Sequence, residues 1–381
     1  MAMNVVAGRQ PRPVANPPSP GPVELSVIVP TFNERGNVAP LVARLEATLA
    51  GVVWEAIFVD DDSPDGTAQQ VKTIAAADSR VRCLRRVNRR GLAGACIEGI
   101  LGSSAPYVAV IDGDLQHDET LLPRMLDSLR SGQSDLIVAT RFGAGGSAAS
   151  LSPARGMASR LARRLAWMLG GVALSDPMSG FFAIRRDRFE PLATSLSPHG
   201  FKILLDIVMR ARGTLRIAEE PYMFGSRVYG ESKLDTLVVL EYLGLLVSRA
   251  SGDVVTARFL SHALVGIVGL VVHLAALRAG LALGLSFIQA YALGAVVAFG
   301  ANFLVTNGLV THRDRRLRDL AVIRGLLVFG VTSVLGLAAG MGTAAWLYSI
   351  RPVWWLAGSV GAVIGAVCSH ATSPRFDWHL K

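Results

Sequence analysis

Cysteine is nearly absent from the chain: Cys83, Cys96 and Cys368 are the three in 381 residues, with neither a paired framework nor a zinc-ligand spacing. This excludes a disulfide scaffold and suits a reducing compartment. Acidic residues are also few, 29 against 38 lysines and arginines, so the net charge of +9 favours anionic partners such as phosphates or a lipid surface. Residues 1–22 are rich in proline and lack an apolar core, so we expect a flexible tail, not a signal peptide or membrane anchor.

Apolar residues, in contrast, are abundant and unevenly distributed. They make up 51% of the chain, and the mean hydropathy is +0.41, which is high for a soluble enzyme. In the second half, segments of 19, 34, 26 and 23 residues carry no formal charge. A membrane-spanning helix needs about 20 apolar residues, so the pattern favours four spans over buried helices of a soluble domain. The expected spans are 259–279, 286–310, 325–349 and 353–373.

The distribution of arginine predicts how these spans are oriented. Five arginines lie between Arg313 and Arg324, whereas the two outer turns carry only Arg278 and Arg351. The positive-inside rule then places the central loop, the first half and the C-terminus in the cytoplasm. We therefore expect a multi-pass protein of the inner membrane whose first half is cytoplasmic. A nucleic-acid partner is not expected, because the arginines cluster beside the spans and not among exposed aromatic residues.

The first half alternates between strand-like and helix-like segments. Short apolar runs rich in β-branched residues, "LSVIVP", "EAIFVD", "YVAVID" and "DLIVAT", predict strands buried on both faces. Between the first two lies a helical pattern over Val38–Leu49, with Asn37 as its expected N-cap and Gly51 past its end. Strand–helix alternation predicts an α/β fold with a mostly parallel sheet.

Acidic and polar residues directly follow three of the predicted strands, in "PTFNE", "DDDSPDGT" and "DGDLQHDE". Ligands of parallel α/β sheets bind beyond the carboxyl ends of the strands, so we expect the three clusters to meet at one edge. Asp112 and Asp114 can both turn towards one ion, and Gln116 can add a carbonyl oxygen. Oxygen ligands of this kind favour Mg²⁺ or Mn²⁺, which leave coordination positions for substrate phosphates.

Two further segments have the composition of membrane-surface helices. The segment 152–171 sets arginines among apolar residues and Trp167, and residues 233–256 lead into the first span. A basic amphipathic helix is also compatible with a solvated face of a soluble core. Beside four spans, contact with the membrane interface is the favoured interpretation.

Taken in order, "SVIVPTFNE", "FVDDDSPDGT", "VIDGDLQH", "DPMSGFFAIRR" and "SRVYGESKL" resemble family 2 glycosyltransferases of the GT-A fold, especially polyprenyl-phosphate (dolichol-phosphate) mannose synthases. The likeness covers about Val23 to Leu234, and the four predicted spans after it resemble a GtrA-type membrane domain. It implies a Rossmann-like GT-A domain followed by an all-α transmembrane domain of four helices. The expected divisions are a tail (1–22), the GT-A domain (23–232), interfacial helices (233–256) and the membrane domain (257–381).

The resemblance also implies roles for residues that match the family's motifs. The nucleotide-sugar ligands would be Pro30, Phe32, Glu34, Val59, Asp61, Asp112, Gly113, Asp114, Arg141, Lys202, Arg227 and Lys233. The metal ligands would be Asp112, Asp114 and Gln116, and the acceptor phosphate would meet Arg155 and Ser159. Asp112, Asp114 and Arg141 would be the catalytic residues. Phe32 replaces the tyrosine often found at its position, which keeps a stacking face and loses a hydroxyl.

The implied reaction is transfer of mannose from GDP-mannose to a polyprenyl phosphate, releasing GDP. The acceptor phosphate is already largely ionised near neutral pH, since its second pKa is about 6, so we expect no general base. Attack opposite the leaving group would invert the anomeric centre and give a β-mannosyl product. Two alternatives stay open: a polyprenyl-phosphate glucose synthase that uses UDP-glucose, and an inactive flippase or assembly scaffold. A homo-oligomer formed through the membrane domain is compatible with the sequence.

Overall fold

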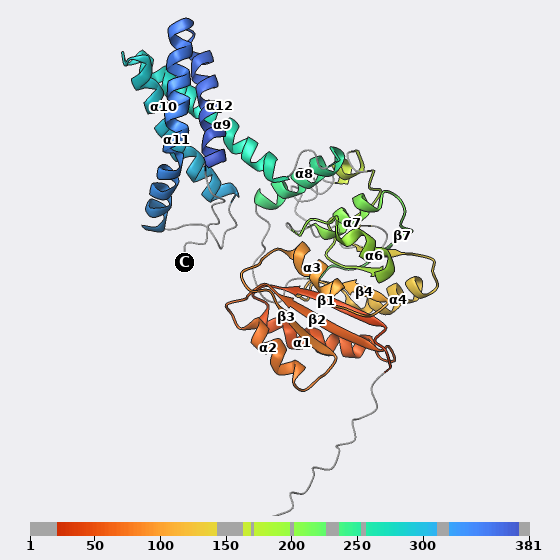
Figure 1. Ribbon diagram of the computed structural model, residues 1–381. Helices are drawn as coiled ribbons and strands as arrows, with labels where there is room; N and C mark the ends of the chain where they lie inside the picture. Colours follow the sequence, from red (N-terminus) through yellow and green to blue (C-terminus); the bar gives the residue numbers. More distant parts are fainter. Residues whose placement is uncertain are drawn as a thin grey trace, which may run out of the picture. The chain divides into compact units, whose positions relative to one another are not determined.

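The computed structural model describes residues 21–142, 163–168, 171–198, 202–225, 236–252, 257–310 and 320–372. The chain divides into two compact units, Met1–Glu231 and Ser232–Lys381. The first unit combines a sheet with helices, and the described elements of the second are all helical (Figure 1). The predicted fold class, a mostly parallel α/β domain followed by a helical region, is confirmed.

The first unit is built on a seven-stranded sheet with the strand order β3-β2-β1-β4-β6-β5-β7. The strands are β1 (Leu25–Thr31), β2 (Trp54–Asp60), β3 (Val81–Arg85), β4 (Tyr107–Val110), β5 (Leu136–Thr140), β6 (Phe182–Arg185) and β7 (Ile217–Pro221). Within the sheet β6 alone is antiparallel to its neighbours, β4 and β5. The four predicted strands correspond to β1, β2, β4 and β5, and β3, β6 and β7 were not predicted.

Helices cover both faces of this sheet, as the continuous burial of β1, β2 and β5 requires (Figure 1). On one face, Leu41 and Met125 belong to the same buried cluster as Val27 of β1. On the other face, Gly99 lies so close to the sheet that a Cβ there would be 2.9 Å from Val59 Cγ2. The helices are α1 (Arg35–Thr48), α2 (Thr67–Ala75), α3 (Leu92–Leu101), η1 (Glu119–Leu121), α4 (Leu122–Arg130), α6 (Arg186–Ala193) and α7 (Ile203–Ala211).

The start of α1 differs from the prediction. Asn37 is not the N-cap: the helix begins at Arg35, and Asn37 is buried in its first turn. The unpaired N–H groups of this turn find acceptors 30 residues further along the chain, in the loop after β2. Asp65 Oδ2 accepts the Arg35 N–H at 3.1 Å, and Thr67 Oγ1 accepts the Glu34 N–H at 3.0 Å. The helix therefore begins three residues before the predicted Val38, and a rule that considers only neighbouring residues could not find this start, because the acceptors come from a distant loop.

The described part of the second unit consists of helices. They are α8 (Thr236–Ala250), α9 (Ala257–Ala282), α10 (Phe287–Val305), the π-helical η3 (Thr306–Val310), α11 (Leu320–Ile350) and α12 (Trp354–Thr372). The largest contacts pair α9 with α10 and α11 with α12. Two glycine pairs four residues apart face each other in the second pair, Gly336 and Gly340 against Gly361 and Gly365. Facing glycines let two helix backbones approach closely, as in membrane helix pairs.

Among the described residues, two helical segments are long and apolar enough to cross a membrane: Ala263–Ala282 and Phe287–Gly308. α11 and α12 contain shorter apolar segments, Val334–Ile350 and Trp354–Ser369. Many large apolar side chains of these helices are exposed on the unit's surface, for example Ile267 at 61% and Val296 at 62%. The structure thus has helices at all four predicted positions, and four membrane crossings stay a prediction.

Candidate active site

The carboxyl ends of β2, β1 and β4 lie side by side, because these strands are parallel neighbours. The acidic segments that follow them therefore meet at one edge of the sheet, as predicted. The Asp61 N–H donates to the Thr31 carbonyl at 3.0 Å, which joins two of the segments. A Cβ on Gly113 would lie 3.1 Å from Thr31 Cγ2, so glycine allows the third segment to approach β1.

Asp112 and Asp114 follow β4 with different exposures. The Asp112 side chain is 33% exposed, whereas Asp114 is buried and its Oδ1 accepts the Gln116 N–H at 3.2 Å. Leu115 after them has a φ of 62°, a left-handed conformation that costs a non-glycine residue about 1–2 kcal/mol. A Cβ on Gly180 would lie 2.7 Å from Asp112 Cγ, so a glycine is required opposite this carboxylate.

The loop that carries these carboxylates is fastened to the segment after β7. The Gly225 N–H donates to the Gln116 carbonyl at 2.8 Å, and Gln116 Nε2 donates to the Gly225 carbonyl at 3.0 Å. Oε1 is therefore the side-chain atom of Gln116 that would coordinate a metal ion. The next residue, His117, has Nδ1 at 2.6 Å from Tyr222 Oη and Nε2 at 3.3 Å from Asp112 Oδ2.

The sequence does not predict the contact between His117 and Tyr222, which are 105 residues apart. The His117 ring is buried in an aromatic cage, with ring centroids 5.5 Å from Phe181, 5.7 Å from Tyr222 and 5.4 Å from Phe224. Burial raises the pKa of the Tyr222 phenol well above its ordinary value, so its hydroxyl stays protonated. The available sequence signal was weak: a histidine next to the acidic cluster, and aromatic residues after a strand.

Arg141 directly follows β5 and reaches the same edge of the sheet. Its Nε and Nη2 donate to the two oxygens of Asp176 at 2.7 and 2.9 Å, and its Cζ lies 5.3 Å from the centre of the Phe224 ring. Burial alone would lower the pKa of Arg141, but the hydrogen bonds and charge of Asp176 raise it. The guanidinium is thus held as a fixed positive charge, and charge–charge attraction reaches from it to Asp112.

Asp61, expected to contact the nucleoside, forms a buried anchor in the structure. Its Oδ1 accepts from Arg86 Nη1 at 2.6 Å, and its Oδ2 accepts the Gly91 N–H at 2.7 Å. Burial raises its pKa, and these two partners oppose that shift. The ion pair fixes the loop between β3 and α3 at this edge, including Arg90, the residue before Gly91.

The other expected nucleoside ligands lie around the ends of β1 and β2. Pro30 and Val59 are partners in the register of these strands. Glu34 immediately precedes α1, and its Oε2 accepts from Asn37 Nδ2 at 2.6 Å. The Arg90 Cζ lies 4.3 Å from the centre of the Phe32 ring, which is too close to admit a base between them. A base stacked on that face of Phe32 would take the place of Arg90.

The remaining expected ligands are further along the chain. Lys202 immediately precedes α7, which packs on α3 and α6. Arg155, Ser159, Arg227 and Lys233 lie outside the described residues. The structure therefore brings Asp61, Asp112, Asp114 and Arg141 to one edge, and places no part of the expected acceptor site.

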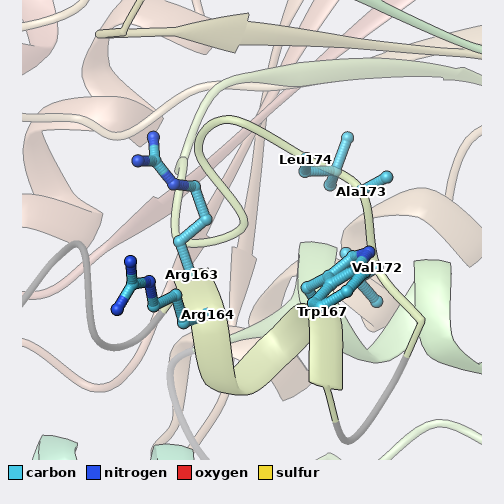
Figure 2. Close-up of a pocket in the computed structure, with 6 residues that line it drawn as sticks. All are labelled: Arg163, Arg164, Trp167, Val172, Ala173 and Leu174. Atoms are coloured by element: carbon cyan, nitrogen blue, oxygen red, sulfur yellow. The ribbon is translucent and has the colours of Figure 1, made fainter.

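A pocket of about 250 Å³ lies at the described end of the basic segment (Figure 2). Its lining residues are Arg163, Arg164, Trp167, Val172, Ala173 and Leu174. In Figure 2 the two arginines extend on one side and Trp167 lies beside Val172 on the other. Trp167 is 64% exposed, and the Arg163 Cζ lies 5.7 Å from the centre of the Phe142 ring, next to Arg141. The pocket thus combines cations with exposed apolar surface.

In the described part of the chain, no three His, Cys, Asp or Glu side chains converge as a metal site would require. Mg²⁺ and Mn²⁺ do not require such a cage, because one or two carboxylates and substrate phosphates suffice to bind them. Asp112 and Asp114 supply two hard oxygen donors at a strand end, and the absence of a side chain at Gly180 leaves room for the Asp112 carboxylate. The residues present therefore fit a divalent cation that is shared with a bound phosphate.

Comparison with known proteins identifies both units. Residues 26–192 match the family model of glycosyl transferase family 2, and residues 261–378 match that of the GtrA/DPMS transmembrane domain. A dolichol-phosphate mannosyltransferase of Pyrococcus furiosus is 30% identical over 363 residues, which cover 93% of this chain and 99% of the relative. The chain belongs to the family 2 glycosyltransferases.

Two other relatives match this family 2 glycosyltransferase over a shorter length. Dolichol-phosphate mannosyltransferases of Mycosarcoma maydis and Saccharomyces cerevisiae are 38% and 35% identical over 230 residues. Each match covers 58% of this chain, and the matches cover 77% and 85% of the two relatives. A solved glucosyl-3-phosphoglycerate synthase of Mycobacterium tuberculosis is 23% identical, with a TM-score of 0.46 and coverage of 60% of this chain and 80% of the other. That likeness is too distant to bear on the donor or the metal.

The comparisons also account for the apolar second unit. The match to a transmembrane domain spans most of α9 through α12, whose outward faces carry exposed large apolar side chains. Such surface is stable in contact with lipid, and it would promote aggregation in water. The family 2 glycosyltransferase described here is therefore a membrane protein.

Proposed function

We propose that this glycosyltransferase transfers mannose from GDP-mannose to a polyprenyl phosphate of the dolichyl type, releasing GDP. The observation that carries the proposal is the match along nearly the whole of both chains to a relative named dolichol-phosphate mannosyltransferase. Both units take part in that match. The pairing of a catalytic α/β unit with a membrane domain suits a reaction between a water-soluble donor and a lipid acceptor.

The donor is proposed to bind across the ends of β1, β2 and β4. Phe32 is proposed to stack on the base, and Pro30, Glu34, Val59 and the anchored Asp61 are proposed as further ligands of the nucleoside. The diphosphate would extend towards Asp112, Gly113, Asp114 and Arg141. Lys202, Arg227 and Lys233 are proposed as further cations for the diphosphate.

A divalent cation, Mg²⁺ or Mn²⁺, is proposed to be held by Asp112, Asp114 and Gln116. When bound, such a cation neutralises negative charge on a diphosphate leaving group. Asp112 is exposed enough to contact a ligand. Asp114 is buried, and its Oδ1 accepts a hydrogen bond from the Gln116 N–H. Their proposed role is to place this cation, not to transfer a proton.

The leaving GDP would gain negative charge as the glycosidic bond breaks, and Arg141 is proposed to stabilise that charge. Asp176 holds two of the five guanidinium N–H donors and so fixes the plane of the group before the donor arrives. The acceptor phosphate is itself the nucleophile and is largely ionised near neutral pH. An oxygen of this phosphate would form the new bond to the anomeric carbon as the bond to GDP breaks. Attack from the opposite side would give the β-mannosyl product.

The lipid phosphate is proposed to bind Arg155 and Ser159. The pocket at the end of this segment, with Arg163, Arg164 and the exposed Trp167, supports an approach from the membrane interface. Tryptophan favours the headgroup region, and arginines attract anionic headgroups. We also propose that the catalytic unit is cytoplasmic, on the basis of the positive-inside rule. Reporter fusions near Arg316 and at the C-terminus test this topology. A signal from the outer side of the membrane at either position would contradict it.

A panel of donors and acceptors tests the proposal. Purified protein is incubated with GDP-mannose, UDP-glucose or GDP-glucose and with dolichyl or undecaprenyl phosphate, and the glycolipid is identified by mass spectrometry. Mannolipid from GDP-mannose alone is the expected product. Formation of glucolipid from UDP-glucose would instead identify the protein as a polyprenyl-phosphate glucose synthase. If the folded protein used none of the donors, the result would favour an inactive scaffold.

A further inference from the structure

His117 connects two parts of the chain that meet at the proposed metal site. It lies in the loop with Asp112, and its ring is buried against Tyr222, which follows β7. Both ring nitrogens are engaged: Nδ1 with the Tyr222 hydroxyl at 2.6 Å, and Nε2 with Asp112 Oδ2 at 3.3 Å. In the described part of the chain, His117 is the one side chain within hydrogen-bond distance of the Asp112 carboxylate.

One imidazole ring bridges the two partners, because its nitrogens lie on different sides of the ring. Nδ1 is within hydrogen-bond distance of the Tyr222 hydroxyl, and Nε2 is within hydrogen-bond distance of the Asp112 carboxylate. Tyr222, His117 and Asp112 thus form one hydrogen-bonded chain in which each ring nitrogen has a partner.

Rigid packing surrounds this chain. Phe181 and Phe224 contact the edges and faces of the His117 ring, and the Tyr222 N–H donates to the Thr140 carbonyl at 3.0 Å. The histidine ring therefore cannot turn without moving three aromatic side chains. Asp112, in contrast, has a third of its side chain exposed to solvent, which does not fix the carboxylate. A fixed hydrogen-bond partner on one of its oxygens restricts rotation of the carboxylate.

We propose that His117 is a positioning residue that aims the Asp112 carboxylate at the divalent cation, and that Tyr222 holds the His117 ring in the orientation that this requires. The inference rests on the proposed metal-dependent transfer. Outer groups that orient a metal ligand typically contribute a factor of 10–100 to metal affinity. His117 itself touches neither cation nor substrate in this arrangement, since both of its nitrogens are engaged by the protein.

The test measures Mn²⁺ binding to the purified full-length protein, using the electron paramagnetic resonance signal of free Mn²⁺ in the presence of saturating GDP. The variants are His117→Phe, which fills the cage and removes both hydrogen bonds, Tyr222→Phe, and the double variant. Tyr107→Phe, at the start of β4, is the matched control for loss of one tyrosine hydroxyl. Thermal unfolding verifies that each variant is folded, and GDP affinity in chelator is measured alongside.

The expected result is Mn²⁺ affinity 10–100-fold weaker in His117→Phe and less weakened in Tyr222→Phe. The double variant should bind Mn²⁺ as His117→Phe does, because the tyrosine acts through the histidine. The Mn²⁺ concentration for half-maximal transfer should rise by the same factor, with kcat largely restored at saturating Mn²⁺. GDP affinity in chelator should not change, and Tyr107→Phe should match the wild type in every assay.

Unchanged Mn²⁺ affinity in folded His117→Phe would overturn the inference and leave the proposed function intact. If His117→Phe does not fold, the Tyr222→Phe variant, which loses a single oxygen atom, decides the question. Wild-type Mn²⁺ affinity in Tyr222→Phe would overturn the role of Tyr222 and with it the hydrogen-bonded chain. Failure of the wild type to bind Mn²⁺, or full transfer in chelator, would instead contradict the metal-dependent function on which the inference rests.

Discussion

Asp61 and Arg86 form an ion pair of 2.6 Å in which the side chains are 9% and 4% exposed. The same carboxylate accepts the Gly91 N–H, so the end of β2 holds the loop in front of α3. That loop presents Arg90 over the Phe32 ring. Asp61 therefore acts on the expected base-binding face through the backbone that it anchors.

Asp61→Asn should destabilise the protein and weaken GDP binding together. The change removes the shorter of two ion pairs of the buried Arg86, which keeps Glu98 at 3.2 Å. Breaking a buried pair typically costs about 3–5 kcal/mol. Differential scanning fluorimetry of the full-length protein and calorimetry with GDP measure the two effects. Asp78→Asn is the matched control, because Asp78 pairs with Arg80 near the surface, where such a pair contributes about 0–1 kcal/mol. Wild-type stability of Asp61→Asn with lost GDP binding would contradict the anchoring role and favour direct contact with the nucleoside.

Much of the fold could be predicted because its signals are local. β1, β2, β4 and β5 are continuous apolar runs, and the parallel sheet follows from their alternation with helices. β3 was missed because "VRCLR" is an edge strand with two arginines and little burial. β6 was missed because four residues, "FAIR", become a strand only by pairing antiparallel between β4 and β5.

The candidate site also has features that the sequence predicts and features that it does not. The carboxylates after β4 could be predicted because strand ends of a parallel sheet converge. The contact of His117 with Tyr222 could not, since no periodicity links residues 105 apart. The true cap of α1 was hidden for the same reason: it comes from Asp65 and Thr67, in the loop after β2.

Asp135 should make stability depend on pH in the acid range. Hydrogen bonds from Arg216, with a further contribution from Arg188, hold the pKa of this carboxyl far below its ordinary value near 3.9. A lowered folded-state pKa contributes stability that is complete above the ordinary pKa and is lost as the pH falls towards the folded-state pKa. Melting temperatures of wild type and Asp135→Asn, measured from pH 7 to pH 2, should converge below about pH 4. A constant difference across that range would show that Asp135 contributes no proton-linked stability.

Gly340→Val should separate α11 from α12. A Cβ at this position would lie 2.6 Å from the Gly361 carbonyl and 2.8 Å from the Tyr291 hydroxyl. Overpacking of this kind typically costs about 1–3 kcal/mol, so the detergent-solubilised protein should unfold at a lower temperature. Gly342→Val is the control on the same helix, because a Cβ there meets nothing within 4 Å. Equal melting temperatures for the two variants would contradict the close glycine contact.

Arg155→Ala should impair use of the lipid acceptor and spare the donor. A lost hydrogen bond to a charged group costs about 1.5–3 kcal/mol, which would raise the KM for dolichyl phosphate or lower kcat by roughly 10–100-fold. Arg155→Lys should restore only part of the loss, because lysine lacks the planar, two-pronged donor set. GDP-mannose binding by calorimetry provides the control. Weaker donor binding with unchanged acceptor kinetics would move Arg155 from the acceptor site to the donor site.

The most direct test is formation of mannolipid from GDP-mannose and dolichyl phosphate by the purified full-length protein. The reaction is run with Mg²⁺ or Mn²⁺, in excess chelator, and with Asp112→Asn and Asp114→Asn variants that are verified as folded. The account predicts dolichyl β-mannosyl phosphate from the wild type with metal, and nearly complete loss of product in chelator and in both variants. Undiminished mannolipid synthesis by the wild type in chelator, or by the Asp112→Asn protein with metal, would contradict the account.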